Sequence, residues 1–370
     1  MPRSSTLLFI LIATIAVECN VEKPTLPKFP AILVFGDSTV DTGNNNYILT
    51  PFKGDHPPYG LDFPGSFSTG RFSNGKLVPD ILASMMGLKE TIPPFLDPNL
   101  SDREILTGVS FASAGSGFDE LTTSLSRVIP MSKQPRLFEQ YVKRVEGVVG
   151  RDEAGRILSG ALVIVSAGTN DFIFNYYDVP TRRIQFVTVG MYQDFLLNKL
   201  QNMVKELYNL GCRKMVVSGL PPIGCLPIQI TTKSPILRSC SRKENADAQS
   251  YNHKLEKQLL PQLEAELPRS KIVYVDSYNP LMDMINDPHK YGKFFSKICV
   301  RNISCRFVET RRGCCGTGFL EAGPLCTQLT PVCANPSQYL FWDSIHPGES
   351  TYRILSEKLS ASLLTKLSLF

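Results

Sequence analysis

Short apolar segments alternate along the chain with longer segments in which apolar residues recur every three or four positions. The short segments are rich in β-branched residues and end in glycine or polar residues: Ala31–Phe35, Ala161–Ser166, Lys214–Leu220 and Lys271–Asp276. Because they are continuously apolar rather than alternating, they are typical of strands in a parallel sheet that is covered on both faces.

The segments between these strands have helical periodicity. Between the second and third strands, apolar residues repeat at three- and four-residue steps up to Gly211: Leu196, Leu200, Val204, Leu207 and Leu210. The range 245–267 is mostly polar, with leucines at every fourth position, which predicts a surface helix. The repeated strand–helix order predicts an α/β fold, a three-layer α/β/α sandwich of flavodoxin-like type with a mostly parallel sheet and right-handed crossovers.

Length and composition are compatible with one large domain or with two. The chain has 370 residues, of which 43% are hydrophobic, so it can bury a core and is neither disordered nor collagen-like. No internal repeat or linker divides it, and we expect one domain over 27–366, with long loops such as the Gly-, Pro-, Asn- and Ser-rich range 41–75. A net charge of +5 without a basic block does not favour nucleic acid as a partner.

The amino terminus has the pattern of an export signal. Arg3 precedes an apolar run from Leu7 to Val17, and small residues occur near Ala16. Because eleven residues are about half of what spans a bilayer, we expect residues 1–19 to be a signal peptide with an approximate end. A signal anchor or a buried strand is the alternative interpretation. The mature protein is then expected to be secreted, with no integral membrane segment.

Secretion changes the interpretation of the cysteines and of two tripeptides. If Cys19 is removed, nine cysteines remain, and six of them lie between Cys299 and Cys333. In an oxidising compartment this cluster predicts disulfides that hold a long loop, with one thiol left unpaired. Zinc is disfavoured because ligand spacings are missing, so we expect no metal and no cofactor. Asn99 and Asn302 begin N-x-S tripeptides and are candidate glycosylation sites.

Polar residues follow the predicted strands at their carboxyl ends, where open α/β sheets bind ligands. Ser38 follows the first strand closely, and Asn170 follows the second, with a side-chain N–H suited to a developing oxyanion. The small-residue range 108–117 lies between them and allows close approach of backbone N–H groups to a ligand. Each feature alone also fits a plainer structure, namely an N-cap serine, an Asx turn or a packing turn.

The fourth feature is the sequence Asp343-Ser-Ile-His346-Pro near the carboxyl end. A general base needs an imidazole and a carboxylate that orients it, and residues three apart on one turn can supply both. Alone, such a pair is usually a surface turn. Together with Ser38 and Asn170, it predicts acyl transfer through a serine ester.

These residues lie in motifs that resemble the plant GDSL esterase/lipase family of the SGNH hydrolase superfamily. The motifs are FGDSTVDTGNNNY, GVSFASAGSGF, SAGTNDF and FWDSIHP, and GLPPIGCLP and GCCGTG also match. The resemblance extends over about residues 31–364 and implies an SGNH hydrolase-like fold with esterase or lipase activity.

The resemblance also implies a role for each matching residue. Ser38 would be the nucleophile and His346 the general base, oriented by Asp343. The oxyanion hole would come from the N–H of Ser38, the side chain of Asn170 and one residue of the second motif. We choose Gly115 for that position over its neighbours Ala114 and Gly117. Thr39 stands where the family has leucine, and there we expect an effect on packing rather than on chemistry.

The leading hypothesis is therefore a secreted enzyme that hydrolyses carboxylic, acyl lipid-like esters through an acyl-enzyme. Its partner would be a small-molecule or lipid ester substrate. One alternative is an extracellular acyltransferase of the same chemistry, in which an alcohol replaces water. The other is a catalytically idle binding protein on the same scaffold.

Overall fold

The computed structural model describes residues 28–124, 126–179, 181–291 and 307–367. The predicted signal peptide, the candidate glycosylation site Asn302, and Cys299 and Cys305 lie outside these residues. No helix within the described ranges is long and apolar enough to cross a membrane.

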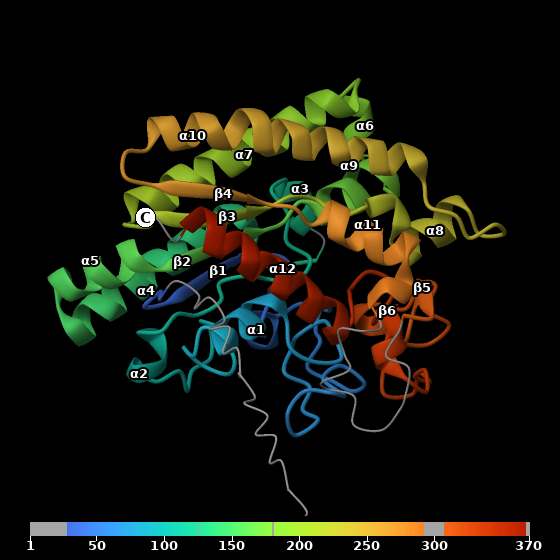
Figure 1. Ribbon diagram of the computed structural model, residues 1–370, viewed down its shortest axis with the longest axis horizontal. Coiled ribbons are helices and arrows are strands. Elements are labelled where there is room, and N and C mark those ends of the chain that lie inside the picture. The colour runs from blue at the N-terminus through green and yellow to red at the C-terminus, as the bar shows by residue number, and fades with distance from the viewer. Residues whose placement is uncertain (1–27, 125, 180, 292–306, 368–370) are drawn as a thin grey trace, which may run out of the picture.

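Four parallel strands form the central sheet of the described part, in the order β1-β2-β3-β4 (Figure 1). They are β1 (Ile32–Gly36), β2 (Leu162–Ser166), β3 (Lys214–Ser218) and β4 (Lys271–Val275). Each coincides with a predicted strand, with ends that differ by one or two residues. In register, Gly36 pairs with Ser166 and Ser218 pairs with Val275, so the carboxyl ends of the strands meet at one edge of the sheet.

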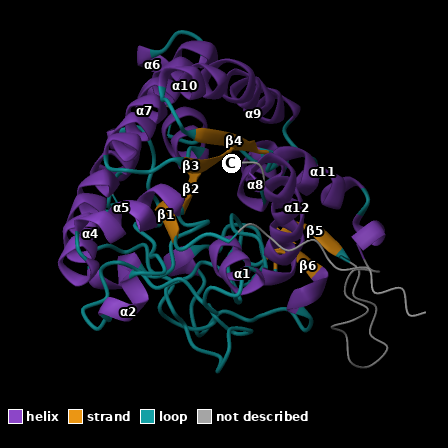
Figure 2. Cartoon of the chain, turned by 60° about the vertical axis from the view of Figure 1, so that its left-hand side comes forward, coloured by secondary structure: helices purple, strands orange, loops and turns teal. Residues whose placement is uncertain are grey.

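Helices cover both faces of this sheet, which explains why its strands are continuously apolar. Figure 2 shows one face covered by α4 (Gln134–Val149), α5 (Arg151–Gly160), α7 (Val189–Asn209), α9 (Arg242–Lys254) and α10 (Leu260–Glu266). The other face lies against α1 (Val78–Met85) and α12 (Glu349–Leu367). Alternate strand residues enter the two cores, Val163 and Val165 on one side and Leu162 and Ile164 on the other. This is the predicted three-layer α/β/α sandwich.

Both predicted helices are present. The periodic segment before Gly211 is the carboxyl half of α7. The range 245–267 is α9, a π-helical segment (Leu255–Leu259) and α10 in succession. The structure also has shorter helices that the sequence analysis did not identify: α2 (Asp102–Ile105), α3 (Glu120–Ser124), α6 (Thr181–Gln185), α8 (Pro227–Lys233) and α11 (Tyr278–Asn286).

The range 108–111 extends the sheet beyond β1, although we took this small-residue segment for a loop. The N–H of Val34 donates to the Val109 carbonyl at 3.1 Å, and the N–H of Phe111 donates to the Val34 carbonyl at 2.7 Å. A side chain at Gly108 would place its Cβ 1.9 Å from the Ile32 carbonyl oxygen. Glycine is therefore needed for this segment to approach β1.

Three disulfides occur among the described residues: Cys225–Cys240, Cys314–Cys333 and Cys315–Cys326. Two of them hold the predicted cysteine-rich loop against a small parallel sheet of β5 (Glu309–Gly313) and β6 (Tyr339–Phe341). Cys212 is a buried free thiol, and burial raises its pKa.

Glu244 in α9 provides a stability prediction. Its side chain is buried, its Oε2 has no hydrogen-bond partner in the described part, and the Lys233 ammonium lies 4.0 Å from its Oε1. Burial raises the pKa of Glu244 from 4.5 to about 7. Between these values the native state holds a proton that the unfolded chain has released. The free energy of unfolding therefore falls as the pH rises through this window.

We expect Glu244→Gln to stabilise the protein by about 1–3 kcal/mol at pH 8 and by little at pH 4. Urea unfolding of the variant and the wild type at both pH values measures this difference. Glu139→Gln, at an exposed position of α4, is the control and should change stability little at either pH. A stabilisation by Glu244→Gln that is the same at pH 4 and pH 8 would contradict the prediction.

Candidate active site

Ser38 is presented by a tight turn at the carboxyl end of β1. A side chain at Gly36 would place its Cβ 2.1 Å from the Ser166 carbonyl oxygen, so the turn has no room for one. The N–H of Asp37 donates to that carbonyl, and the Asp37 carboxylate accepts from the N–H and hydroxyl of Thr39 at 2.9 and 2.7 Å. Burial raises the pKa of Asp37. Thr39 thus holds the Asp37 carboxylate through two hydrogen bonds, and its expected effect on packing rather than on chemistry stays a prediction.

Asp343 and His346 lie on one turn between β6 and α12. The turn is closed by the N–H of Trp342, which donates to the His346 carbonyl at 2.7 Å. The Asp343 Oδ1 accepts from the N–H groups of Ile345 and His346, each at 2.8 Å. The Asp343 Oδ2 lies 2.7 Å from the Nδ1 of His346. The three-residue spacing therefore brings carboxylate and imidazole into contact locally.

The structure also brings Ser38 to this turn. The Nε2 of His346 lies 2.7 Å from the Oγ of Ser38, across 308 positions of sequence. All three side chains are buried, with 6% of Ser38, 4% of His346 and none of Asp343 exposed. An imidazole with a carboxylate on one nitrogen and a hydroxyl on the other can accept the hydroxyl proton.

Asn170 lies near Gly115, because its side chain is hydrogen-bonded to Ser116, the residue that follows Gly115. The Nδ2 of Asn170 donates to the Ser116 carbonyl at 2.9 Å, which leaves its second amide hydrogen available. Neither the Ser38 N–H nor the Gly115 N–H donates to an acceptor within the described ranges. Gly115 needs glycine for its φ of +84°, whereas a Cβ at Gly117 would lie 2.3 Å from the Asp171 carboxylate. The absence of a side chain at Gly117 is thus explained by packing.

The polar residues after Ser38 hold the 108–117 segment in place, although we took 41–75 for a surface loop. The Asp41 carboxylate accepts from the N–H of Ala114 at 2.9 Å. The side-chain amide of Asn44 donates to two carbonyls of the segment, and that of Asn45 donates to the Ala114 carbonyl at 2.9 Å. These side chains are buried, and burial raises the pKa of Asp41 to about 6. They therefore fix the backbone on either side of Ala114, next to Gly115.

Tyr59 is a site residue that the sequence analysis missed. Its hydroxyl donates to the Asp343 Oδ2 at 2.7 Å. Tyr59 lies within the long loop between β1 and α1, where no spacing rule links it to Asp343. Its contact depends on tertiary structure alone.

A cavity of about 720 Å³ begins at Ser38 and follows the carboxyl ends of β2, β3 and β4. One side is apolar and lies between the sheet and α12, with Ile164, Val216, Leu355 and Leu359 among its residues. The other side is polar and includes Asn252 on α9. This volume is in the range of small-molecule sites.

The candidate glycosylation site Asn99 lies on the surface. Its side chain is exposed in a turn, where its N–H donates to the Asp97 carboxylate at 2.9 Å. Its glycosylation stays a prediction.

Comparison with known proteins identifies the family. The family model for GDSL-like lipase/acylhydrolase matches residues 32–359. GDSL esterase/lipase At2g30310 of Arabidopsis thaliana is 51% identical to the chain, with 98% of each chain covered. GDSL esterase/lipase At2g31550 of the same plant is 52% identical, with 96% of each chain covered. Since the match extends over nearly the whole chain, the protein belongs to the GDSL-like lipase/acylhydrolase family of carboxylic ester hydrolases.

Proposed function

We propose that the protein is a secreted serine esterase or lipase that hydrolyses acyl lipid-like esters with Ser38, His346 and Asp343 as its catalytic triad. The observation that carries this proposal is the continuous contact from the Ser38 hydroxyl through the His346 imidazole to the Asp343 carboxylate, with 2.7 Å at each step. This line of contacts lies at the cavity that begins at Ser38.

In this mechanism the Ser38 Oγ attacks the acyl carbon, while the Nε2 of His346 takes the hydroxyl proton. The carbonyl oxygen becomes an oxyanion. It accepts hydrogen bonds from the backbone N–H groups of Ser38 and Gly115 and from the side-chain amide of Asn170. His346 then gives its proton to the departing alkoxide, which leaves as the alcohol. Water attacks the acyl-enzyme with His346 again as base, and this releases the acid and restores Ser38. Every step uses groups of the chain and water.

Two further observations support the substrate class and the location. The apolar side of the cavity, between the sheet and α12, suits the aliphatic part of an acyl ester. The three disulfides suit an oxidising compartment, which agrees with the export pattern of residues 1–19.

A fluorophosphonate probe tests the proposal directly, because it reacts with activated serine hydroxyls. We expect one covalent adduct, which mass spectrometry of the digested protein places on the peptide that contains Ser38. Heat-denatured protein is the control and should not react. A folded protein without an adduct would favour the idle binding protein. Product analysis with an acyl ester and added alcohol would show the acyltransferase as a new ester in place of free acid.

A further inference from the structure

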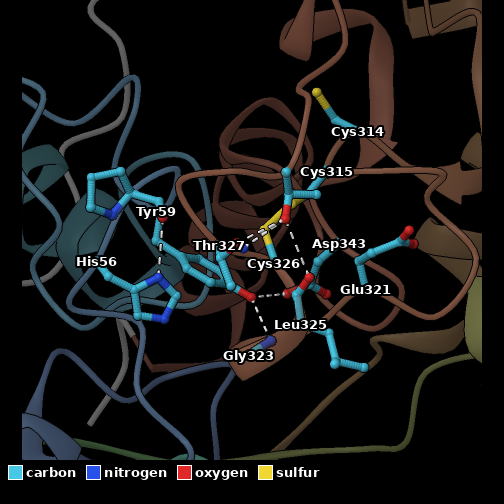
Figure 3. The surroundings of a disulfide bond; sticks show 12 residues. His56, Tyr59, Cys314, Cys315, Glu321, Gly323, Leu325, Cys326, Thr327 and Asp343 are labelled. Carbon is cyan, nitrogen blue, oxygen red and sulfur yellow. Dashed lines mark hydrogen bonds between the residues drawn. A yellow bond between two sulfur atoms is a disulfide. The ribbon is translucent and has the colours of Figure 1, made fainter.

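We propose that Tyr59 is a positioning residue of this active site, and that the loop closed by the Cys315–Cys326 disulfide orients its hydroxyl toward Asp343. This inference rests on the proposed role of Asp343 in orienting His346. The argument begins from two hydrogen bonds that meet at the Tyr59 hydroxyl, which Figure 3 shows beside the disulfide.

The Tyr59 hydroxyl donates to the Asp343 Oδ2 at 2.7 Å. That oxygen also lies 2.7 Å from the Nδ1 of His346, while the Oδ1 accepts the two backbone N–H groups of the turn. The Asp343 side chain is fully buried, so these donors replace the water that a carboxylate would otherwise bind. Among the residues that the structure describes, Tyr59 is the donor to this carboxylate that comes from outside the turn.

Gly323 fixes the direction of the Tyr59 hydrogen bond. Its N–H donates to the Tyr59 hydroxyl oxygen at 2.7 Å. A phenol has a single proton, and with its oxygen accepting from Gly323 that proton is left for Asp343. Burial raises the pKa of Tyr59 well above 10, and the negative charge of Asp343 adds to this effect. The raised pKa and the Gly323 hydrogen bond both favour the protonated hydroxyl as a donor to Asp343.

The disulfide connects this pair to the catalytic turn. Gly323 begins a short 3-10 helix (Gly323–Leu325) that is followed directly by Cys326. Cys326 is bonded to Cys315, and the N–H of Cys315 donates to the Trp342 carbonyl at 2.8 Å, next to Asp343. One end of the loop thus holds the turn and the other end holds the Tyr59 hydroxyl. A loop closed at both ends keeps the Gly323 N–H in place relative to Asp343.

The titratable groups around this pair come from several elements. His346 lies on the same turn. Burial raises the pKa of Tyr352 on α12, and the charges of Asp37 and Asp343 add to this effect. The His56 ring packs edge-on against Tyr59, with ring centroids 5.6 Å apart. The effect of Tyr59 on pH dependence is therefore measured by a variant that leaves these groups in place.

Tyr59→Phe removes only the hydroxyl. We expect kcat for a soluble p-nitrophenyl ester to fall about 10- to 100-fold, since a hydrogen bond to a charged group is lost, with KM changed little. Without this donor the Asp343 carboxylate is a stronger acceptor for the His346 imidazole. The acidic limb of the pH–rate profile is therefore expected to move to higher pH.

Tyr141→Phe is the matched control. Tyr141 is also fully buried, and its hydroxyl donates to the Ile105 carbonyl at 2.7 Å, in the core formed with α4. The Tyr141→Phe variant therefore loses a comparable buried hydrogen bond, at a position away from the site. We expect its kcat and pH profile to match the wild type, whatever its stability. Equal changes in both variants would show a merely structural role and overturn the inference.

The contribution of the disulfide is tested by a double-mutant cycle. Replacing Cys315 and Cys326 together by serine should lower kcat and shift the acidic limb in the same direction as Tyr59→Phe. If the loop acts through Tyr59, adding Tyr59→Phe to this variant causes little further loss. Losses that multiply, in variants shown to be folded by circular dichroism, would contradict a shared path.

A measurement without turnover separates this inference from the proposed function. The Nδ1–H proton of His346 in contact with a carboxylate gives a far-downfield proton NMR signal. We expect this signal to move in Tyr59→Phe and not in Tyr141→Phe. An unchanged signal in Tyr59→Phe overturns the inference, even if the wild type hydrolyses esters. A shifted signal in a protein that a fluorophosphonate does not label supports the inference while the proposed function fails.

Discussion

Replacing Ser38 by alanine is expected to lower kcat for p-nitrophenyl ester hydrolysis by about ten thousand-fold or more. The change removes the oxygen that lies 2.7 Å from the Nε2 of His346, so no acyl-enzyme can form. The fold should survive, because alanine needs no more room than serine at this buried position. Initial rates and thermal unfolding, measured on the same preparation, test both statements.

Ser159→Ala is the control for this experiment, since Ser159 lies exposed on α5 and its hydroxyl only contacts that helix. It should hydrolyse the ester at the wild-type rate. Substantial activity in folded Ser38→Ala protein would mean that the nucleophile is another residue, and the proposed mechanism would be wrong.

Asn170→Ala is expected to lower kcat by about 100-fold or more, with a smaller change in KM. The second amide hydrogen of Asn170 is proposed to meet the oxyanion, whose charge develops only in the transition state. Loss of that donor should therefore affect turnover more than substrate binding. Steady-state kinetics with a soluble ester separates kcat from KM.

Asn175→Ala tests whether the effect belongs to the oxyanion. Asn175 is buried in the π-helical segment (Asp171–Tyr177) that directly follows Asn170, and its amide donates to the Thr122 hydroxyl at 2.7 Å. The variant should be less stable and should keep a kcat within a few-fold of the wild type. If both asparagine variants lose kcat equally, Asn170 contributes to the integrity of the segment rather than to the oxyanion hole.

Features that depend on local sequence could be predicted, and contacts between distant segments could not. The four strands are continuously apolar because helices cover both faces of the sheet, and that pattern is visible in the sequence. The Asp343–His346 contact lies within a three-residue turn, so the spacing made the contact possible, although such a pair alone is usually a surface turn. The placement of Ser38 against His346 followed from the resemblance of motifs, since 308 positions separate the two residues.

The contact between the range 108–111 and β1 could not be predicted from the amino-acid composition of this segment. Its small residues favour a loop, yet its backbone hydrogen bonds pair it with β1 in a parallel bridge between Ser110 and Val34. The buried amides of Asn44 and Asn45 were misjudged for the same reason, because polar residues in a Gly-rich stretch usually face solvent. Disulfide pairing and the role of Tyr59 depend on which distant loops meet, and no periodicity encodes that.

Asp343 and His346 lie on one turn, so the site is completed where this turn meets the end of β1 that carries Ser38. Carboxylate and imidazole move together because backbone hydrogen bonds close the turn, so only its placement against the β1 end can vary. Hydrogen bonds from several segments contribute to that placement, among them those from the Ser73 hydroxyl to the Pro347 carbonyl and from the Glu349 N–H to the Asn74 side chain. A scaffold that offers a strand end and a helix start at this separation could therefore receive the three proposed catalytic residues as two short peptide grafts.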